Sequence, residues 1–254
     1  MTQKNLQETI KNSKDKFSNV FKSQQHKPPR QYIYEDNPDS YAYGINRYKL
    51  AWLFVCGSLM GYVAETIWYL YLRGKIINRQ GVLYGPFSPI YGVMFVLLTC
   101  LLYRDRLQNW KKIFLTSMLS VTAFEYACSW LMEHILGTKS WSYAKKAFNI
   151  NGRVCLQMSI MWGILGLLFI KFFYPLISRT IENFKPRFGK VVGTILFYFL
   201  VIDCIFSFLV SLRQTERRNG IEASNALEEW IDDYYTDEKL AEIYTEIRIV
   251  KKKT

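Results

Sequence analysis

The stretch Tyr48–Leu72, YKLAWLFVCGSLMGYVAETIWYLYL, decides the class of fold, because it stays apolar over the length that a helix needs to cross a bilayer. A spanning helix takes roughly 20 residues with few charges. Similar runs follow at about 86–103, 112–136, 154–177 and 191–212. The alternating pattern of a β-barrel is absent. The sequence therefore predicts an all-α fold, a polytopic membrane bundle of about five transmembrane helices.

The composition agrees with a membrane protein. Half of the 254 residues are hydrophobic and 17% are aromatic, more than an ordinary soluble domain uses. The net charge of +12 does not indicate nucleic-acid binding, because the basic residues flank the apolar runs, where phospholipid headgroups attract them. Membrane lipids are the expected partners. The five cysteines lie in or beside apolar runs without a Cys-x-x-Cys pair, so we expect no metal and no cofactor.

Three regions divide the chain. Residues 1–47 are polar and Lys- and Gln-rich and are predicted to be mostly disordered, 48–212 form the transmembrane domain, and 213–254 form an amphipathic tail. Apolar residues recur at helical spacing from Trp230 to Ile247, which predicts one or two tail helices. We expect a multi-pass protein of the cell membrane. Lys and Arg are balanced between the two sides, so a cytoplasmic N-terminus is expected only from the Lys-rich tail without a signal sequence.

A second stretch, Asn78–Gly92 or NRQGVLYGPFSPIYG, is too apolar for a soluble loop and too broken for a helix. Its glycines permit unusual backbone angles, and Pro86 and Pro89 suit the first turn of a helix, where a missing N–H matters least. Non-helical backbone at membrane depth has to be covered by protein or by a water-filled cavity. We therefore predict a re-entrant loop that packs against FNINGR, residues 148–153. Its structural residues are Gly85, Pro86, Pro89 and Gly92, with Gly152 in the facing loop.

Four ionisable residues inside the predicted spans are candidates for function, because such residues are costly in lipid: Glu65, Glu125, Glu133 and Asp203. Glu65 shares a helix face with Gly57 and Gly61, a GxxxG pattern that lets another helix approach closely. At 1.5 Å per residue, Glu65, Glu125 and Asp203 lie ~10, ~16 and ~14 Å from the same end of the bundle. They are predicted to face one polar cavity at that end.

Loops at the same end supply arginines to these carboxylates. Arg79 and Arg153 are predicted to form charge-assisted pairs with glutamates there. Such pairs either lock the bundle or line a substrate or ion site, and the sequence leaves both readings open. The predicted cavity or substrate residues are Glu65, Asn78, Arg79, Tyr84, Tyr91, Glu125, Glu133, Asn151, Arg153 and Asp203.

Three stretches resemble a known family: GYVAETIWYLYLRGKIINRQGVLYGPFSPIYG at 61–92, FEYACSWLMEHILGTKSWSYAKKAFNINGRVCL at 124–156 and YYTDEKLAEIYTEIR at 234–248. Together they resemble the bacterial type IV ABC-transporter permeases, also called CmpB-like, over roughly Leu50 to Arg248. One departure is Gln80, inserted before the glycine of the loop motif. The resemblance implies a permease and carries no catalytic mechanism. By motif position it points to the same loop and acidic residues.

The expected function is a permease-like transport component with a polar cavity, because intramembrane carboxylates beside a broken helix are typical of transporter sites. No GxxxxGK[ST] motif occurs, so the ATPase of an ABC transporter would be a separate subunit. One alternative is an intramembrane enzyme acting on a lipid or envelope precursor. It is less favoured, because the chain has neither a Ser-His-Asp arrangement nor HExxH. Another is an assembly or regulatory membrane subunit that contacts another membrane protein through its tail.

Overall fold

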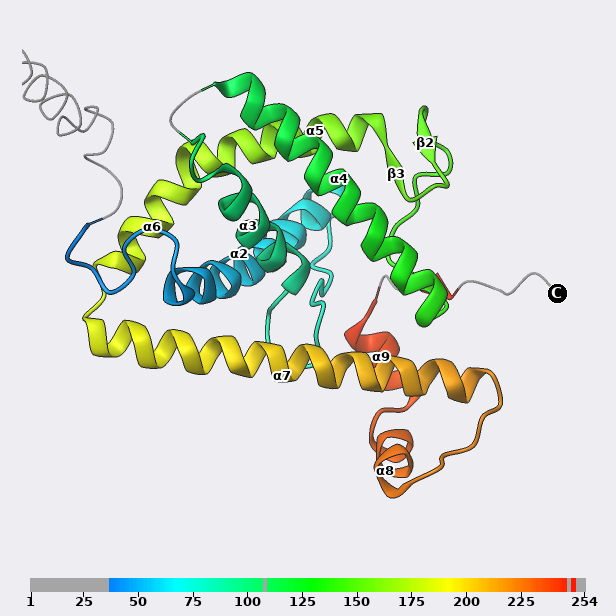
Figure 1. Ribbon diagram of the computed structural model, residues 1–254. Coiled ribbons are helices and arrows are strands. Elements are labelled where there is room, and N and C mark those ends of the chain that lie inside the picture. The colour runs from blue at the N-terminus through cyan, green and yellow to red at the C-terminus, as the bar shows by residue number, and fades with distance from the viewer. Residues whose placement is uncertain (1–36, 107–108, 246–247, 250–254) are drawn as a thin grey trace, which may run out of the picture. The chain divides into compact units, whose positions relative to one another are not determined.

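The computed structural model describes residues 37–106, 109–245 and 248–249, and these are largely helical (Figure 1). The predicted disorder of the N-terminal region falls mostly outside them. The bundle segments are α2 (Arg47–Arg73), α3 (Pro89–Leu102), α4 (Trp110–Ile135), the run α5 (Leu156–Leu168), η2 (Phe169–Phe173) and α6 (Tyr174–Glu182), and α7 (Pro186–Arg218). Helices α8 (Ala226–Tyr234) and α9 (Asp237–Ile243) follow. The predicted all-α fold is confirmed.

Three of the bundle segments are long and apolar enough to cross a membrane: α2, the continuous run 156–182 and α7. Helix α3 has 14 residues, and α4, although 26 residues long, is less apolar than those three. Large apolar side chains stay exposed on the spanning helices, among them Ile67 and Ile202. Such surfaces suit lipid rather than water. The chain is a membrane protein, and the prediction of about five spans is confirmed for three by length and composition.

The fourth predicted run, 154–177, ends too early at Pro175 and the residues just after it, because the helix continues to Glu182. The turn before Pro175 is the π-helix η2, and this wider turn accommodates a residue that has no N–H to donate. Helix α7 is longer than predicted at both ends. Helix α3 begins at Pro89, and Pro86 stays in the loop, where Phe87 accepts a hydrogen bond from Gly81 N.

Helices α2 and α3 pack closely because three glycines leave room between them. A Cβ on Gly61 would lie 2.3 Å from the ring of Tyr91, and one on Gly92 would lie 2.4 Å from the carbonyl oxygen of Phe54. The GxxxG face of α2 thus meets α3, as its spacing predicts. This contact brings the start of α3, and the loop before it, against the C-terminal half of α2.

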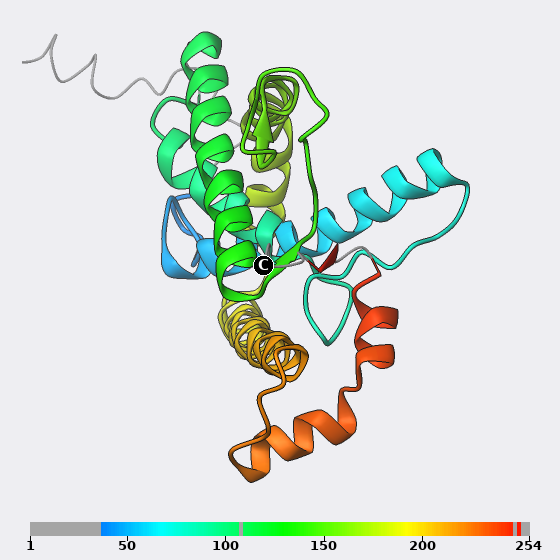
Figure 2. The ribbon, with the colours of Figure 1, turned by 90° about the vertical axis from the view of Figure 1, so that its right-hand side faces the viewer.

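Two short antiparallel pairs, which the sequence did not predict, close the loops at one end. Strands β2 (Asn149–Ile150) and β3 (Val154–Cys155) form a hairpin whose turn places Asn151 and Gly152 at positive φ, 52° and 67°. Strand β1 (Thr138–Lys139) pairs with β4 (Arg248–Ile249) after the tail helices. Figure 2 shows α8 and α9 beside the C-terminal part of α7. Their contact buries an apolar cluster separate from the bundle core: Leu83, Val210, Ile231, Tyr235 and Leu240.

Candidate functional site

A cavity of about 310 Å³ lies where the C-terminal halves of α2 and α7 meet the loop before α3. The end of α4 with the loop after it, and the segment after α9, complete its walls. Most of the lining is apolar, and its main polar side chains are Glu65, Asn78, Arg79, Gln80, Ser140, Ser207, Ser211 and Thr245. Mostly apolar walls with a few convergent polar groups are typical of ligand sites.

One wall of the cavity carries an ion pair. Arg79 Nε lies 2.7 Å from Glu65 Oε2, and the hydroxyl of Tyr91 donates to Glu65 Oε1 at 2.6 Å. The guanidinium also lies over the ring of Tyr69, 4.4 Å from its centroid. Both carboxylate oxygens are thus satisfied, and the charge of Glu65 is neutralised within the wall. Arg79 of the loop thus contacts Glu65, which lies on the GxxxG face of α2.

Asp203 holds the backbone of the loop rather than lining the cavity. Tyr84 N donates to Asp203 Oδ2 at 3.3 Å, Leu83 N donates to Ser207 Oγ at 2.8 Å, and Ser207 Oγ donates to Asp203 Oδ1. Side chains of α7 therefore satisfy loop N–H groups that lipid would leave unpaired. The hydroxyl of Tyr84 lies 2.5 Å from that of Tyr235, between α8 and α9.

Glu125 is not part of the cavity lining. It is 4% exposed, and its two oxygens accept hydrogen bonds from Tyr143 Oη and Trp162 Nε1, each at 2.9 Å. Within the described part of the chain, no Lys or Arg forms an ion pair with it. Burial, and next the charge of the neighbouring Glu125, raise the pKa of Tyr143. The phenol therefore keeps its proton and donates a hydrogen bond to Glu125.

Glu133 forms the second arginine pair of this end. Arg153 Nη2 lies 2.7 Å from Glu133 Oε2, and Lys139 Nζ lies 2.8 Å from Oε1. The nearby Trp141 lines the cavity and donates from Nε1 to the carbonyl oxygen of Arg153. Arg79 and Arg153 therefore lie at the same end of the bundle.

The ten predicted site residues thus separate into clusters. Glu65, Asn78 and Arg79 line the cavity, and Tyr91 contacts it through Glu65. Asn151 donates to the hydroxyl of Tyr126 beside the Glu133 pair. Tyr84, Glu125, Glu133, Arg153 and Asp203 lie outside the lining, and Gln80, Ser207, Tyr244 and Thr245, which were not predicted, are part of it. Contact of any of these residues with a substrate stays a prediction. Among the described residues, no group of three or more His, Cys, Asp and Glu is arranged to hold a metal ion.

The predicted loop residues have distinct roles in the backbone. Gly85 adopts φ +81°, which favours glycine, and Pro89 occupies the first turn of α3, as predicted. Gly92 provides the close approach to α2, and Gly152 turns the β2–β3 hairpin. Pro86 precedes the helix and does not join its first turn.

Charged side chains attach the tail to the end of α7. Asp232 accepts from Arg213 Nη2 at 2.7 Å and from Arg217 Nη1 at 2.8 Å. Asp237 accepts from Arg217 Nη2 at 2.8 Å and from Gln214 Nε2 at 3.0 Å. We call these five residues the tail latch. Hydrogen bonds from Arg213, and then from Arg217, hold the pKa of Asp232 below its usual value.

Acid should weaken this latch. Because the pKa of Asp232 is lowered in the docked state, its contribution is complete above the unfolded pKa of about 3.9 and is lost as the pH falls through the lower docked value. Amide hydrogen exchange of 226–243, corrected for intrinsic rates, should therefore show strong protection at neutral pH and weaker protection at a pH well below the unfolded pKa of about 3.9. Asp232→Asn should show weak protection at both values. Equal protection of the native chain at both would contradict the prediction.

A buried charge cluster at the other end of α2 was missed. Lys49, fully buried, forms an ion pair with Glu182 and donates to Ser178 Oγ at 2.6 Å. Glu182 Oε2 also accepts from Asn37 N at 2.6 Å. The signal was present, since Lys49 lies inside the first apolar run. Lys49 stands at the start of that run, where a charge that flanks the helix is also expected, and Glu182 lies beyond the predicted end of the fourth run at 177.

Comparison with known proteins supplies one match. Residues 52–208 match the family model described as "Putative ABC-transporter type IV". The matched span covers α2 through most of α7 and includes Glu65, Arg79 and the loop between α2 and α3. It stops before the tail latch and before the residues that close the cavity after α9. No curated protein and no solved structure gives a match.

Proposed function

The chain belongs to the family of type IV ABC-transporter proteins, and on this premise we propose that it is the membrane subunit of a transporter that binds its solute in the cavity beside Glu65 and Arg79. The cavity is the observation that carries the proposal. It is bounded in part by non-helical backbone, the loop between α2 and α3, and non-helical backbone that lines a cavity is typical of transporter solute sites.

The lining supports a small amphipathic solute without net charge. The Glu65–Arg79 pair adds no net charge to the wall, and the other polar groups are hydroxyls and amides such as Ser207 and Asn78. Apolar side chains make up most of the remaining surface. Ligand cavities range over roughly 300–1,000 Å³, so a volume of about 310 Å³ suits a small molecule.

The transporter would take its energy from a separate ATPase subunit, because the chain contains no phosphate-binding GxxxxGK[ST] loop. We propose that the N-terminal side of the bundle faces the cytoplasm, where ATP is available. An odd number of crossings then places the cavity on the opposite side. The Lys49–Glu182 end would be the end nearer the ATPase.

The Arg79→Ala variant tests this function. Cells that contain the full chain should distribute a neutral amphipathic solute differently from cells without it, as measured by untargeted profiling of cells and medium. Arg79→Ala leaves Glu65 without its cation and breaks a charge-assisted hydrogen bond of roughly 1.5–3 kcal/mol within the wall, so solute binding that needs the intact, neutral wall should weaken. The difference in solute distribution should therefore fall by about tenfold or more.

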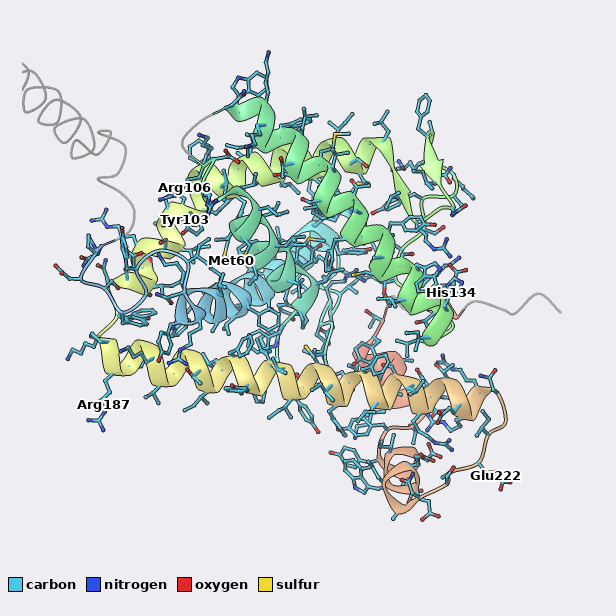
Figure 3. All side chains as sticks on the ribbon, in the orientation of Figure 1. Met60, Tyr103, Arg106, His134, Arg187 and Glu222 are labelled. Atoms are coloured by element: carbon cyan, nitrogen blue, oxygen red, sulfur yellow. The ribbon has the colours of Figure 1, made fainter. Side chains whose placement is uncertain are left out.

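The control is Glu222→Gln. Glu222 is exposed beyond the C-terminal end of α7, at the other end of this helix from Arg187 (Figure 3), and it does not line the cavity. This variant should behave as the native chain does. Purification of the native chain should also bring down an ATPase subunit with a phosphate-binding loop. Unchanged solute distributions together with the absence of an ATPase would overturn the proposed function.

A further inference from the structure

The cavity has a wall that comes from the C-terminal tail. Tyr244 and Thr245 line it, and Thr245 Oγ1 donates to the carbonyl oxygen of Asn78 at 2.9 Å. The other walls belong to the helices and loops of the bundle. This wall comes from the segment after α9, and Tyr244 lies 26 residues beyond Arg218, the last residue of α7.

The tail attaches to the bundle outside the bundle core. Its main attachments are the apolar cluster around Val210, Ile231 and Leu240, the tail latch at the end of α7, and the pairing of β4 with β1. The bundle core, which includes Leu53, Leu102 and Tyr174, contains no tail residue. Release of the tail would therefore expose this apolar cluster and leave the core packed.

The Arg217 half of the latch is suited to reversible attachment, whereas Arg213 is 3% exposed and binds Asp232 from a buried position. Arg217 is 24% exposed, and its partners Asp232 and Asp237 are 23% and 47% exposed. Ion pairs that share their surroundings with solvent are individually weak and are screened by salt. The contact between the hydroxyls of Tyr84 and Tyr235 then links the docked tail to the loop that forms the floor of the same site.

From this arrangement we infer that residues 226–245 form a removable wall of the cavity. Docked, the tail places Tyr244 and Thr245 against the loop and closes that side; released, it opens the cavity to water. The inference rests on the proposed function only in treating the cavity as a solute site. The docking and the opening are properties of the chain that are measured without any solute.

Cys204 reports on this opening because it lines the cavity. The full chain, with Cys56, Cys100, Cys128 and Cys155 replaced by Ser, is placed in liposomes and treated with a charged, membrane-impermeant maleimide. Arg217→Ala removes the ion pairs to Asp232 and Asp237. The labelling rate of Cys204 should rise by roughly tenfold, the effect expected for the loss of two partly exposed ion pairs.

Two matched variants separate release of the tail from damage to the fold. Arg217→Lys keeps the positive charge and should label at close to the native rate. Arg218→Ala removes the neighbouring arginine, which is exposed and forms no ion pair within the described residues. In this variant Cys204 should also be labelled at close to the native rate. Circular dichroism and thermal unfolding should be alike for all these chains, because the bundle core is untouched.

Deletion of residues 219–254 removes the tail altogether, and the labelling rate of Cys204 in this variant should be at least as high as in Arg217→Ala. If the deletion leaves the labelling rate of Cys204 unchanged, the tail is not a wall of the cavity and the inference is wrong. The transport proposal is judged separately, by Arg79→Ala. If deletion speeds the labelling of Cys204 while the native chain shows no transport, the tail is a wall of the cavity and the proposed transport function is wrong.

Discussion

Lys49→Met should destabilise the bundle by about 3–5 kcal/mol, the largest effect expected of any single substitution discussed for this chain. Lys49 is fully buried, and Glu182, its ion-pair partner, has a side chain that is 3% exposed. Removal of the ammonium leaves a buried carboxylate whose remaining donors, within the part of the chain that the structure describes, are neutral: Ser178 Oγ and the backbone N–H of Asn37. Denaturant unfolding in detergent, followed by circular dichroism, measures the loss.

A double variant identifies the cause of this loss. Lys49→Met combined with Glu182→Leu removes both charges, and replacement of a buried pair by apolar groups is often close to neutral. The double variant should therefore recover a large part of the stability. Lys75→Met, at an exposed position after α2, should leave the unfolding curve unchanged. A single Lys49→Met variant that unfolds as the native chain does would show that the buried pair is not a determinant of stability.

Gly92→Ala should give the second large effect, a destabilisation of about 1–3 kcal/mol toward the upper end of that range. The new methyl group would lie 2.3 Å from Ser58 Oγ and 2.4 Å from the carbonyl oxygen of Phe54. The hydroxyl can rotate away, but the carbonyl belongs to the backbone of α2. The two helices would have to separate, and thermal unfolding in detergent should occur at a lower temperature.

Partial rescue is expected from a second change at the same contact. Ser58→Ala removes one of the two obstacles and leaves the Phe54 carbonyl, so the pair Gly92→Ala and Ser58→Ala should recover only a fraction of the loss. Ala64→Leu adds a larger side chain on the exposed face of α2 and should have little effect. If Gly92→Ala unfolds at the native temperature, α2 and α3 are not packed as tightly as the structure shows.

Much of the fold follows from the sequence because membrane helices are specified locally. A run such as Tyr48–Leu72 must satisfy its own backbone hydrogen bonds in lipid, and only a helix does so within one segment. The boundaries of the helices were less predictable. Pro175 resembles a helix end, yet a π-turn, η2, lets the helix continue, and whether that turn forms depends on packing around it.

The site was predicted only in its parts. The sequence identified Glu65 and Arg79 and placed them at one end of the bundle, and the structure joins them at 2.7 Å. The sequence also predicted that Glu125 and Asp203 face the same cavity as Glu65. Instead, Tyr143 and Trp162 enclose Glu125, and the loop backbone occupies the oxygens of Asp203. Depth along a helix sets the level of a side chain, whereas the rotation of the helix sets what it faces.

The sequence by itself determined that this chain is a helical membrane protein of a transporter family, because apolar length and loop motifs are properties of contiguous residues. Only the tertiary structure decided which groups meet. The pair Lys49–Glu182 joins residues 133 positions apart, and Thr245 meets Asn78 across 167 positions. No local pattern encodes such contacts, because their energies depend on burial and on geometry that exist only after the helices and the tail have packed.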